Sequence, residues 1–232
     1  AIKYRTYARA LAARGRARRA KDAFAAVLHA HPRDFQSQFG ICEAEMKRLR
    51  AAKALAACQK VATEMNPFFA PARQRWAEIA EFLAKPAVVS TALIPLREQG
   101  LAEPGDLRRL GRAFVAQEKH AALDALTKSS SDGIDEATQT YLSGLLEQSR
   151  GDLSAANALL SQSAQGLAGD SWAQTAYGHL LLQTGQSTKA MGFFRRAMDL
   201  SRAPMGALGL AQAHMQKREW RRAASTARRA EI

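Results

Sequence analysis

Histidine and cysteine are the residues best suited to metal binding or catalysis, and their spacing in this chain supports neither. His29 and His31 stand two residues apart, so they do not share one face of a helix. Neither has a cysteine or carboxylate partner at the spacing of a zinc site. The chain also has no phosphate-binding glycine loop and no nucleophile elbow. We therefore expect no catalytic residues, no metal ligands and no cofactor, and any enzyme activity would need a separate domain outside this stretch.

Basic residues are the second group that could act on a partner, and they gather at the two ends of the chain. The 232 residues carry a net charge of +13. Residues 1–60 contain 14 Lys or Arg against four Asp or Glu, and residues 195–232 contain nine against three. Such a distribution attracts nucleic acid, anionic lipid or acidic proteins. The alternative is that these side chains are solvated on outer helix faces.

The residues that must position any site follow a period of about 34 residues. In five sets a small residue is followed by apolar or small residues 12, 16 and 19 positions later. The sets are Ala8, Ala20, Phe24, Val27; Cys42, Ala54, Cys58, Val61; Gly144, Ala156, Leu160, Ser163; Gly178, Ala190, Phe194, Ala197; and Ala211, Ala223, Ala227, Ala230. A fixed period of this length predicts stacked supersecondary units.

Each period is expected to contain two amphipathic helices with a turn between them. Glycines such as Gly15 and Gly185 supply turns, Pro32 and Pro67 close units, and Asp170 supplies a helix start. The predicted helices cover residues 3–14, 17–30, 35–48, 51–64, 171–183, 187–200, 204–216 and 220–231. The small residues should lie where paired helices cross, and the larger ones, such as Phe24 and Phe194, where a second helix meets the next unit.

The same register continues through a less regular middle region. It predicts Trp76, Val88, Ala92 and Pro95, and then Leu110, Ala122, Leu126 and Ser129. We expect two degenerate units here. Pro86 should begin a helix, Pro95 should kink or shorten that helix, and residues 129–133 should form a loop.

Cys42 and Cys58 occupy the first and third places of the second set, and two interpretations fit them. In a helical hairpin these places face each other or nearly so, so a disulfide is possible if the Cα atoms come within about 7 Å. Alternatively, both are small buried residues. A disulfide would indicate an oxidising compartment.

This pattern resembles the tetratricopeptide repeat, most clearly in Tyr177-Gly178, Ala190, Phe194 and Ala197, and in Tyr7-Ala8, Ala20, Phe24 and Pro32. The resemblance implies an all-α fold, a right-handed α-solenoid of about seven helix–turn–helix repeats in one array over 1–232. The repeats would cover about 1–34, 35–68, 69–102, 103–136, 137–170, 171–203 and 204–232. The chain, which starts at Ala1 and not at Met, is expected to be part of a longer protein.

The resemblance also implies a concave groove, lined by the first helix of each repeat, that takes a protein or peptide. Groove residues expected at the N-terminal end are mostly charged: Arg5, Arg9, Phe39, Glu43, Lys47 and Arg73. Those expected at the C-terminal end are aromatic, aliphatic or amide: Tyr141, Leu145, Gln148, Trp172, His179, Gln183, Leu208, Gln212 and Met215. Trp172 and Tyr141 could instead pack between repeats.

Chaperone-binding members of this family hold a peptide carboxylate with Lys, Asn and Arg. Arg5 and Arg9 fit two of these places, but Gly40, Ala70 and Gln74 stand at the others, so we do not expect that clamp.

The leading hypothesis is thus a non-enzymatic interaction scaffold, and the Ala- and Arg-rich composition favours a bacterial cell-envelope assembly for secretion, pili or exopolysaccharide export. The alternatives are polyanion or nucleic-acid binding through the basic ends, and a regulatory repeat domain of a larger enzyme.

Overall fold

A computed structural model describes residues 2–128, 134–201 and 204–228, and all regular structure in these ranges is helical. The predicted all-α fold is therefore confirmed. No helix in the described ranges is both long and apolar enough to cross a membrane. The expected loop at 129–133 lies outside the described residues.

The helices are α1 (Ile2–Ala13), α2 (Ala17–Ala30), α3 (Phe35–Lys47), α4 (Ala51–Lys60), α5 (Ala70–Phe82), α6 (Pro86–Glu98), α7 (Pro104–Val115), α8 (His120–Lys128), α9 (Glu136–Arg150), α10 (Leu153–Gly166), α11 (Ser171–Gln183), α12 (Ser187–Leu200), α13 (Pro204–Gln216) and α14 (Trp220–Ala227). A π-helical segment, η1 (Val61–Met65), follows α4 directly.

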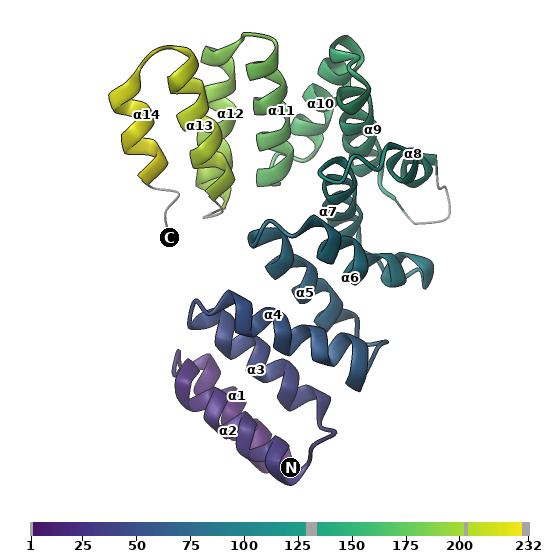
Figure 1. Cartoon of the computed structure of the whole chain (residues 1–232), viewed down its shortest axis with the longest axis vertical. Coiled ribbons are helices and arrows are strands. Elements are labelled where there is room, and N and C mark those ends of the chain that lie inside the picture. The colour runs from purple at the N-terminus through teal and green to yellow at the C-terminus, as the bar shows by residue number, and fades with distance from the viewer. Residues whose placement is uncertain (1, 129–133, 202–203, 229–232) are drawn as a thin grey trace. The chain divides into compact units, whose positions relative to one another are not determined.

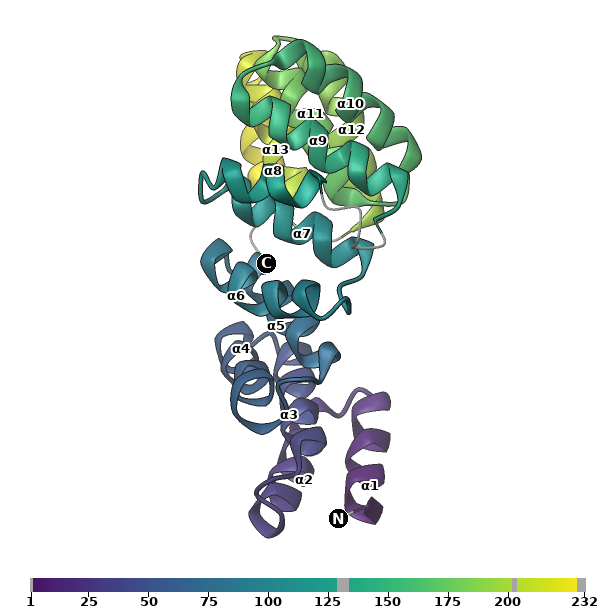
Figure 2. The same cartoon turned by 90° about the vertical axis from the view of Figure 1, so that its right-hand side faces the viewer.

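The chain divides into two compact units, Ala1–Ala113 (unit 1) and Phe114–Ile232 (unit 2). Within unit 1, each helix from α2 to α6 packs on the helix that precedes it. The same holds within unit 2 from α9 to α14. Figures 1 and 2 show this order, in which hairpins of two helices follow one another along each unit.

The predicted helix ends agree closely with the structure. The helices predicted at 17–30, 171–183, 187–200 and 204–216 have these same bounds in α2, α11, α12 and α13. Asp170 caps α11, because its side chain accepts hydrogen bonds from the backbone N–H groups of Trp172 and Ala173. The helix predicted at 51–64 differs, since α4 ends at Lys60 and continues as η1. There the N–H of Asn66 donates to the carbonyl of Val61, five residues earlier, as in a π-helix.

The two prolines of α6 behave differently from each other. Pro86 is its first residue, as predicted. Pro95 does not shorten the helix, which continues to Glu98, so that alternative was wrong. Proline removes only its own N–H donor, and the carbonyls of Pro95 and Leu96 still accept from the N–H groups of Gln99 and Leu101.

Close helix crossings use glycine where a side chain would not fit. A Cβ atom on Gly144 would lie 2.8 Å from the side chain of Leu160, and one on Gly178 would lie 2.7 Å from the ring of Phe194. Phe194 also lies against Gly209 of the following hairpin. This confirms the expected places of both the small residues and the large ones.

The turn inside each hairpin has a residue with positive φ. These residues are Gly15, Leu49, Ala84, Glu118, Gly151, Gly185 and Arg218, with φ between 52° and 86°. Successive members are 33 to 35 residues apart. The 34-residue period therefore continues through the middle region, where the small-residue pattern is weak.

Cys42 of α3 and Cys58 of α4 form a disulfide, with Cα atoms 5.4 Å apart. Both residues are fully buried. Of the two interpretations of these cysteines, the structure has the covalent one, in a place where both residues also fill the hairpin core.

Candidate functional site

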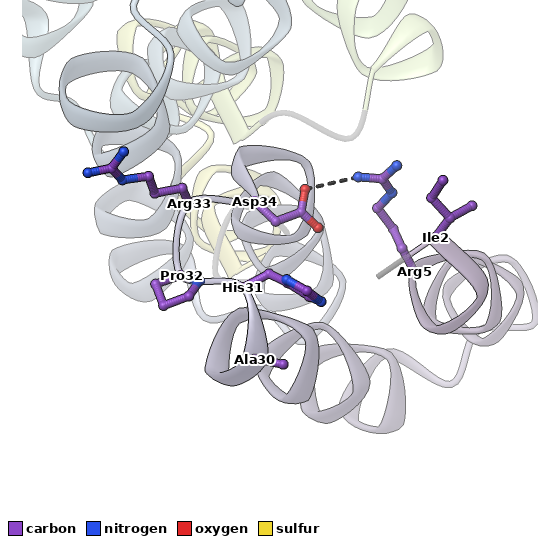
Figure 3. Close-up of a pocket in the computed structure, with 7 residues that line it drawn as sticks. All are labelled: Ile2, Arg5, Ala30, His31, Pro32, Arg33 and Asp34. Atoms are coloured by element: carbon purple, nitrogen blue, oxygen red, sulfur yellow. Dashed lines mark hydrogen bonds and ion pairs between the residues drawn. The ribbon is translucent and has the colours of Figure 1, made fainter.

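In unit 1, the charged residues expected in the groove are engaged within the protein. The guanidinium of Arg5 lies 2.9 Å from the carboxylate of Asp34, which also accepts a hydrogen bond from Ser37. Figure 3 shows this ion pair between α1 and the segment that joins α2 to α3. Arg9 donates to the amide oxygen of Gln36 at 3.2 Å. Both arginines therefore connect the first hairpin to the second.

A network of ion pairs links α3, α5 and α7 in the same unit. Glu43 accepts from Arg75 at 2.6 Å. Glu81 accepts from Arg109 at 2.9 Å and pairs with Arg112 at 2.8 Å. The sequence shows a signal for this network that we did not use: Arg75 and Arg109 are 34 residues apart, so they occupy equivalent places on neighbouring first helices.

Three further residues expected in this groove also make internal contacts. The ring of Phe39 packs edge-on against Phe69, with centroids 5.3 Å apart. The Nζ atom of Lys47 donates to the carbonyl of Ala12. Arg73 is buried, which lowers the pKa of its guanidinium, and it donates to the carbonyls of Pro67 and Ala92. The groove assignment of Arg73 was wrong, because its side chain satisfies backbone carbonyls inside the unit.

In unit 2, the first helix of the expected groove turns its aromatic residue inward. Tyr141 of α9 is fully buried and Leu145 is 6% exposed. Helix α9 packs against α8, α10 and α11, so these two side chains fill the space between helices. Their assignment to the groove was wrong, and the alternative of packing between repeats holds for Tyr141. Trp172, in the first turn of α11, is partly buried.

Four other predicted residues do come together, in a pocket between α11 and α13. His179 and Gln183 line it from α11, and Gln212 and Met215 line it from α13. Sequence reasoning missed two lining residues, Leu182 and Gln216. The six form three pairs separated by 33 residues, so the register pairs His179 with Gln212, Leu182 with Met215 and Gln183 with Gln216. That register was the signal that could have found the missing two.

Amide side chains give this pocket its polar character. Gln148 of α9 donates to Gln183 at 2.7 Å. The row of glutamine side chains therefore extends from α13 and α11 to α9, the first helix of the preceding repeat. Gln216 donates to the carbonyl of Leu182 and accepts from Ser187. Gln212 is exposed and has no side-chain hydrogen bond to the described residues. Its amide can donate and accept at the same time.

The pocket is also uncharged near neutral pH. Its one titratable lining residue, His179, packs edge-on against Phe194, with ring centroids 5.1 Å apart. Burial lowers the pKa of His179, so its imidazole stays neutral at pH 7. On α13, Met215 is 52% exposed and Leu208, which lies outside the pocket, is 41% exposed. The chemistry available is hydrogen bonding and apolar contact. Among the described residues, no three His, Cys, Asp or Glu side chains form a group that could hold a metal.

Comparison with known proteins gives the fold. No family model matches the sequence, and no curated protein matches it. Solved structures do match. A tetratricopeptide repeat protein from Parabacteroides merdae has a TM-score of 0.71 at 12% identity, over 99% of this chain and 91% of that one.

Two further structures agree with it. A chain of the APC/C hetero-tetramer Cut9–Hcn1 has a TM-score of 0.59 at 13% identity, over 98% of this chain and 45% of that one. A TPR protein from Thermus thermophilus has a TM-score of 0.50 at 17% identity, over 84% and 89%. With its consecutive helix pairs and its period of 34 residues, this chain therefore has the fold of the tetratricopeptide-repeat proteins.

Proposed function

We propose that the protein is a non-enzymatic interaction scaffold that binds a partner protein or peptide on unit 2. The observation that carries this proposal is the pocket between α11 and α13, where three pairs of residues in repeat register present amide and apolar side chains together. The exposure of Met215 and the solvent-exposed amide of Gln212 leave both side chains open to a ligand.

The pocket suits an uncharged, extended or helical segment. Glutamine side chains can pair with both the N–H and the C=O groups of a peptide. Met215 is flexible and polarisable, so it adapts to different apolar side chains, and covering one such side chain contributes about 1.5–3 kcal/mol. Trp172, at the other end of α11, would extend the surface if a longer segment binds.

We further propose an oxidising compartment, such as a bacterial cell envelope, as the place of this scaffold. The disulfide between Cys42 and Cys58 supports that context, because disulfides persist in secreted and periplasmic proteins. A repeat domain that regulates a larger enzyme would bind its partner in the same pocket between α11 and α13. The experiment below therefore tests the pocket for a scaffold and for a regulatory domain alike.

The test is selection of peptides from a displayed random library against the whole chain, followed by binding measurements. Gln212→Ala with Met215→Ala should weaken binding of the selected peptides about tenfold or more, since two contacts of about 1 kcal/mol or more are lost. Arg195→Ala with Arg196→Ala, on the exposed side of α12, is the control and should change little. Equal binding to the Gln212/Met215 variant and to the wild type would refute the assignment.

A further inference from the structure

We propose that a basic hollow at the turn between α1 and α2 binds an acidic polypeptide segment. The hollow is lined by Arg16, Arg18 and Arg19 at the start of α2, and by Lys47 and Arg48 at the end of α3. It lies within unit 1 and shares no residue with the pocket between α11 and α13. The inference therefore goes beyond the function proposed above.

Among the described residues, four of the five cations of this hollow have no carboxylate partner, and the fifth, Arg48, is paired with Glu45. Residues 1–60 contain four acidic residues, and each is already in an ion pair. The pairs are Asp22 with Lys21, Asp34 with Arg5, Glu43 with Arg75, and Glu45 with Arg48. In the described part of the chain, Arg16, Arg18 and Arg19 form no ion pair, and all three are exposed.

The two cations from α3 are held in place, which reduces the entropy that a ligand must overcome. Lys47 donates to the carbonyl of Ala12 at 3.1 Å, across to the end of α1. Two further ammonium protons remain for a ligand. Arg48 is bound at 3.0 Å by Glu45, whose carboxylate is buried. The hollow thus combines three exposed guanidinium groups from α2 with the held ammonium of Lys47, next to Arg48, whose charge Glu45 offsets.

The start of α2 adds to this field. It has no acidic residue in its first turn, and no side chain caps it. The starts of α9, α10 and α11 differ, since Asp135, Asp152 and Asp170 cap them, whereas α12 and α14 have no side-chain cap, as α2 has none. The uncapped N–H groups of α2 carry partial positive charge toward the hollow.

The lining favours carboxylates of a polypeptide over a nucleic acid. Single-stranded nucleic acid is held by aromatic side chains on which bases stack, and no aromatic residue lines this hollow. The remaining lining residues, Gly15 and Ala17, are small and leave room for a main chain with short acidic side chains.

The experiment measures fluorescence anisotropy of a labelled peptide of about ten glutamates, a length that spans the hollow in extended form, with the whole chain. Arg16→Gln, Arg18→Gln and Arg19→Gln together should weaken binding about tenfold or more, and binding to the wild type should fall as salt rises toward about 0.3 M. The control is Lys53→Gln, Lys60→Gln and Lys85→Gln, which removes the same charge from exposed places outside the hollow. This control should retain most of the affinity.

Three results would overturn the proposal. Equal weakening by the triple variant and by its control would mean that net charge alone attracts the peptide. Tighter binding of an oligothymidine than of the glutamate peptide would assign the hollow to nucleic acid. Absence of peptide binding at low salt would leave no site. The Gln212/Met215 variant should bind the glutamate peptide as the wild type does, so failure of this proposal and failure of the proposed function can be told apart.

Discussion

At the scale of single residues, glycine has two different roles in these helices, and they predict opposite effects of the same substitution. The ring of Phe194 lies where a Cβ of Gly178 would be, whereas a Cβ on Gly192, on the exposed side of α12, would meet nothing within 4 Å. The first glycine makes close packing possible. The second only weakens its helix.

Gly178→Ala should therefore lower the free energy of unfolding by about 1–3 kcal/mol, because overpacking against Phe194 outweighs the better helix propensity of alanine. Gly192→Ala is the matched control and should raise it by about 0.5–1 kcal/mol. Urea unfolding followed by circular dichroism measures both. A stabilising Gly178→Ala would show that the crossing of α11 and α12 is less tight than described.

His179 predicts how stability depends on pH. Burial lowers its pKa in the folded protein, so below about pH 6.5 the unfolded chain binds a proton that the folded protein does not. The free energy of unfolding should then fall as the pH decreases from about 7.5 to about 5. His179→Gln should remove this part of the dependence. If wild type and variant lose the same free energy over that range, His179 is not the group responsible.

At the scale of elements, the disulfide constrains the hairpin of α3 and α4. It closes a loop with a sequence separation of 16 residues. In the chain-entropy description, such a loop contributes about 3 kcal/mol. Reduction with dithiothreitol should lower the free energy of unfolding by about that amount. The Cys42→Ala/Cys58→Ala variant is the control, since a reductant cannot change it. A wild type that is insensitive to reductant would contradict the disulfide's contribution.

The sequence predicts helices well because their limits are set locally. A residue such as Asp170 caps the helix that follows it whatever the neighbouring helices do. Whether a side chain on such a helix is buried or exposed is not set locally. Tyr141 and Arg73 occupy places that a first helix presents to a groove in the idealised repeat, but both are buried by the helices packed around them. Which side of a helix is covered depends on neighbours that the local pattern does not specify.

Part of the candidate pocket could be predicted, because the repeat places equivalent residues on neighbouring first helices. His179, Gln183, Gln212 and Met215 follow from repeat geometry, and the full register would have added their partners Leu182 and Gln216. The disulfide could not be decided from spacing alone, since in the other sets the first place holds Ala or Gly and the third holds Phe, Leu or Ala, so both places accept apolar packing residues.

At the scale of the whole molecule, the turns inside the hairpins predict how the free energy of unfolding responds to glycine substitutions made together. Four of the seven turn residues, Leu49, Ala84, Glu118 and Arg218, hold a positive φ with a side chain present, where the other three are glycine. Changing each to glycine should stabilise by about 0.5–1 kcal/mol, because the left-handed conformation is costly for other residues. The four sites are far apart in the chain, so the combined variant should gain roughly 2–4 kcal/mol.

The control for this prediction is Ala56→Gly, at an exposed place in the middle of α4, which should destabilise by about 1 kcal/mol. Thermal unfolding compares the two variants. A combined variant no more stable than the wild type would mean that these turns are not strained in solution.

The position of Phe194 between Gly178 and Gly209 has a consequence for how the chain unfolds. The ring belongs both to the core of its own hairpin and to the interface with the next hairpin. In a nearest-neighbour description of a repeat protein, it therefore contributes both to the stability of its own repeat and to the coupling energy between neighbouring repeats. A repeat array loses cooperativity when its coupling terms weaken. Phe194→Ala should therefore broaden the unfolding transition as well as lower its midpoint, and the hairpin of α13 and α14 would fray while the rest of unit 2 stays folded.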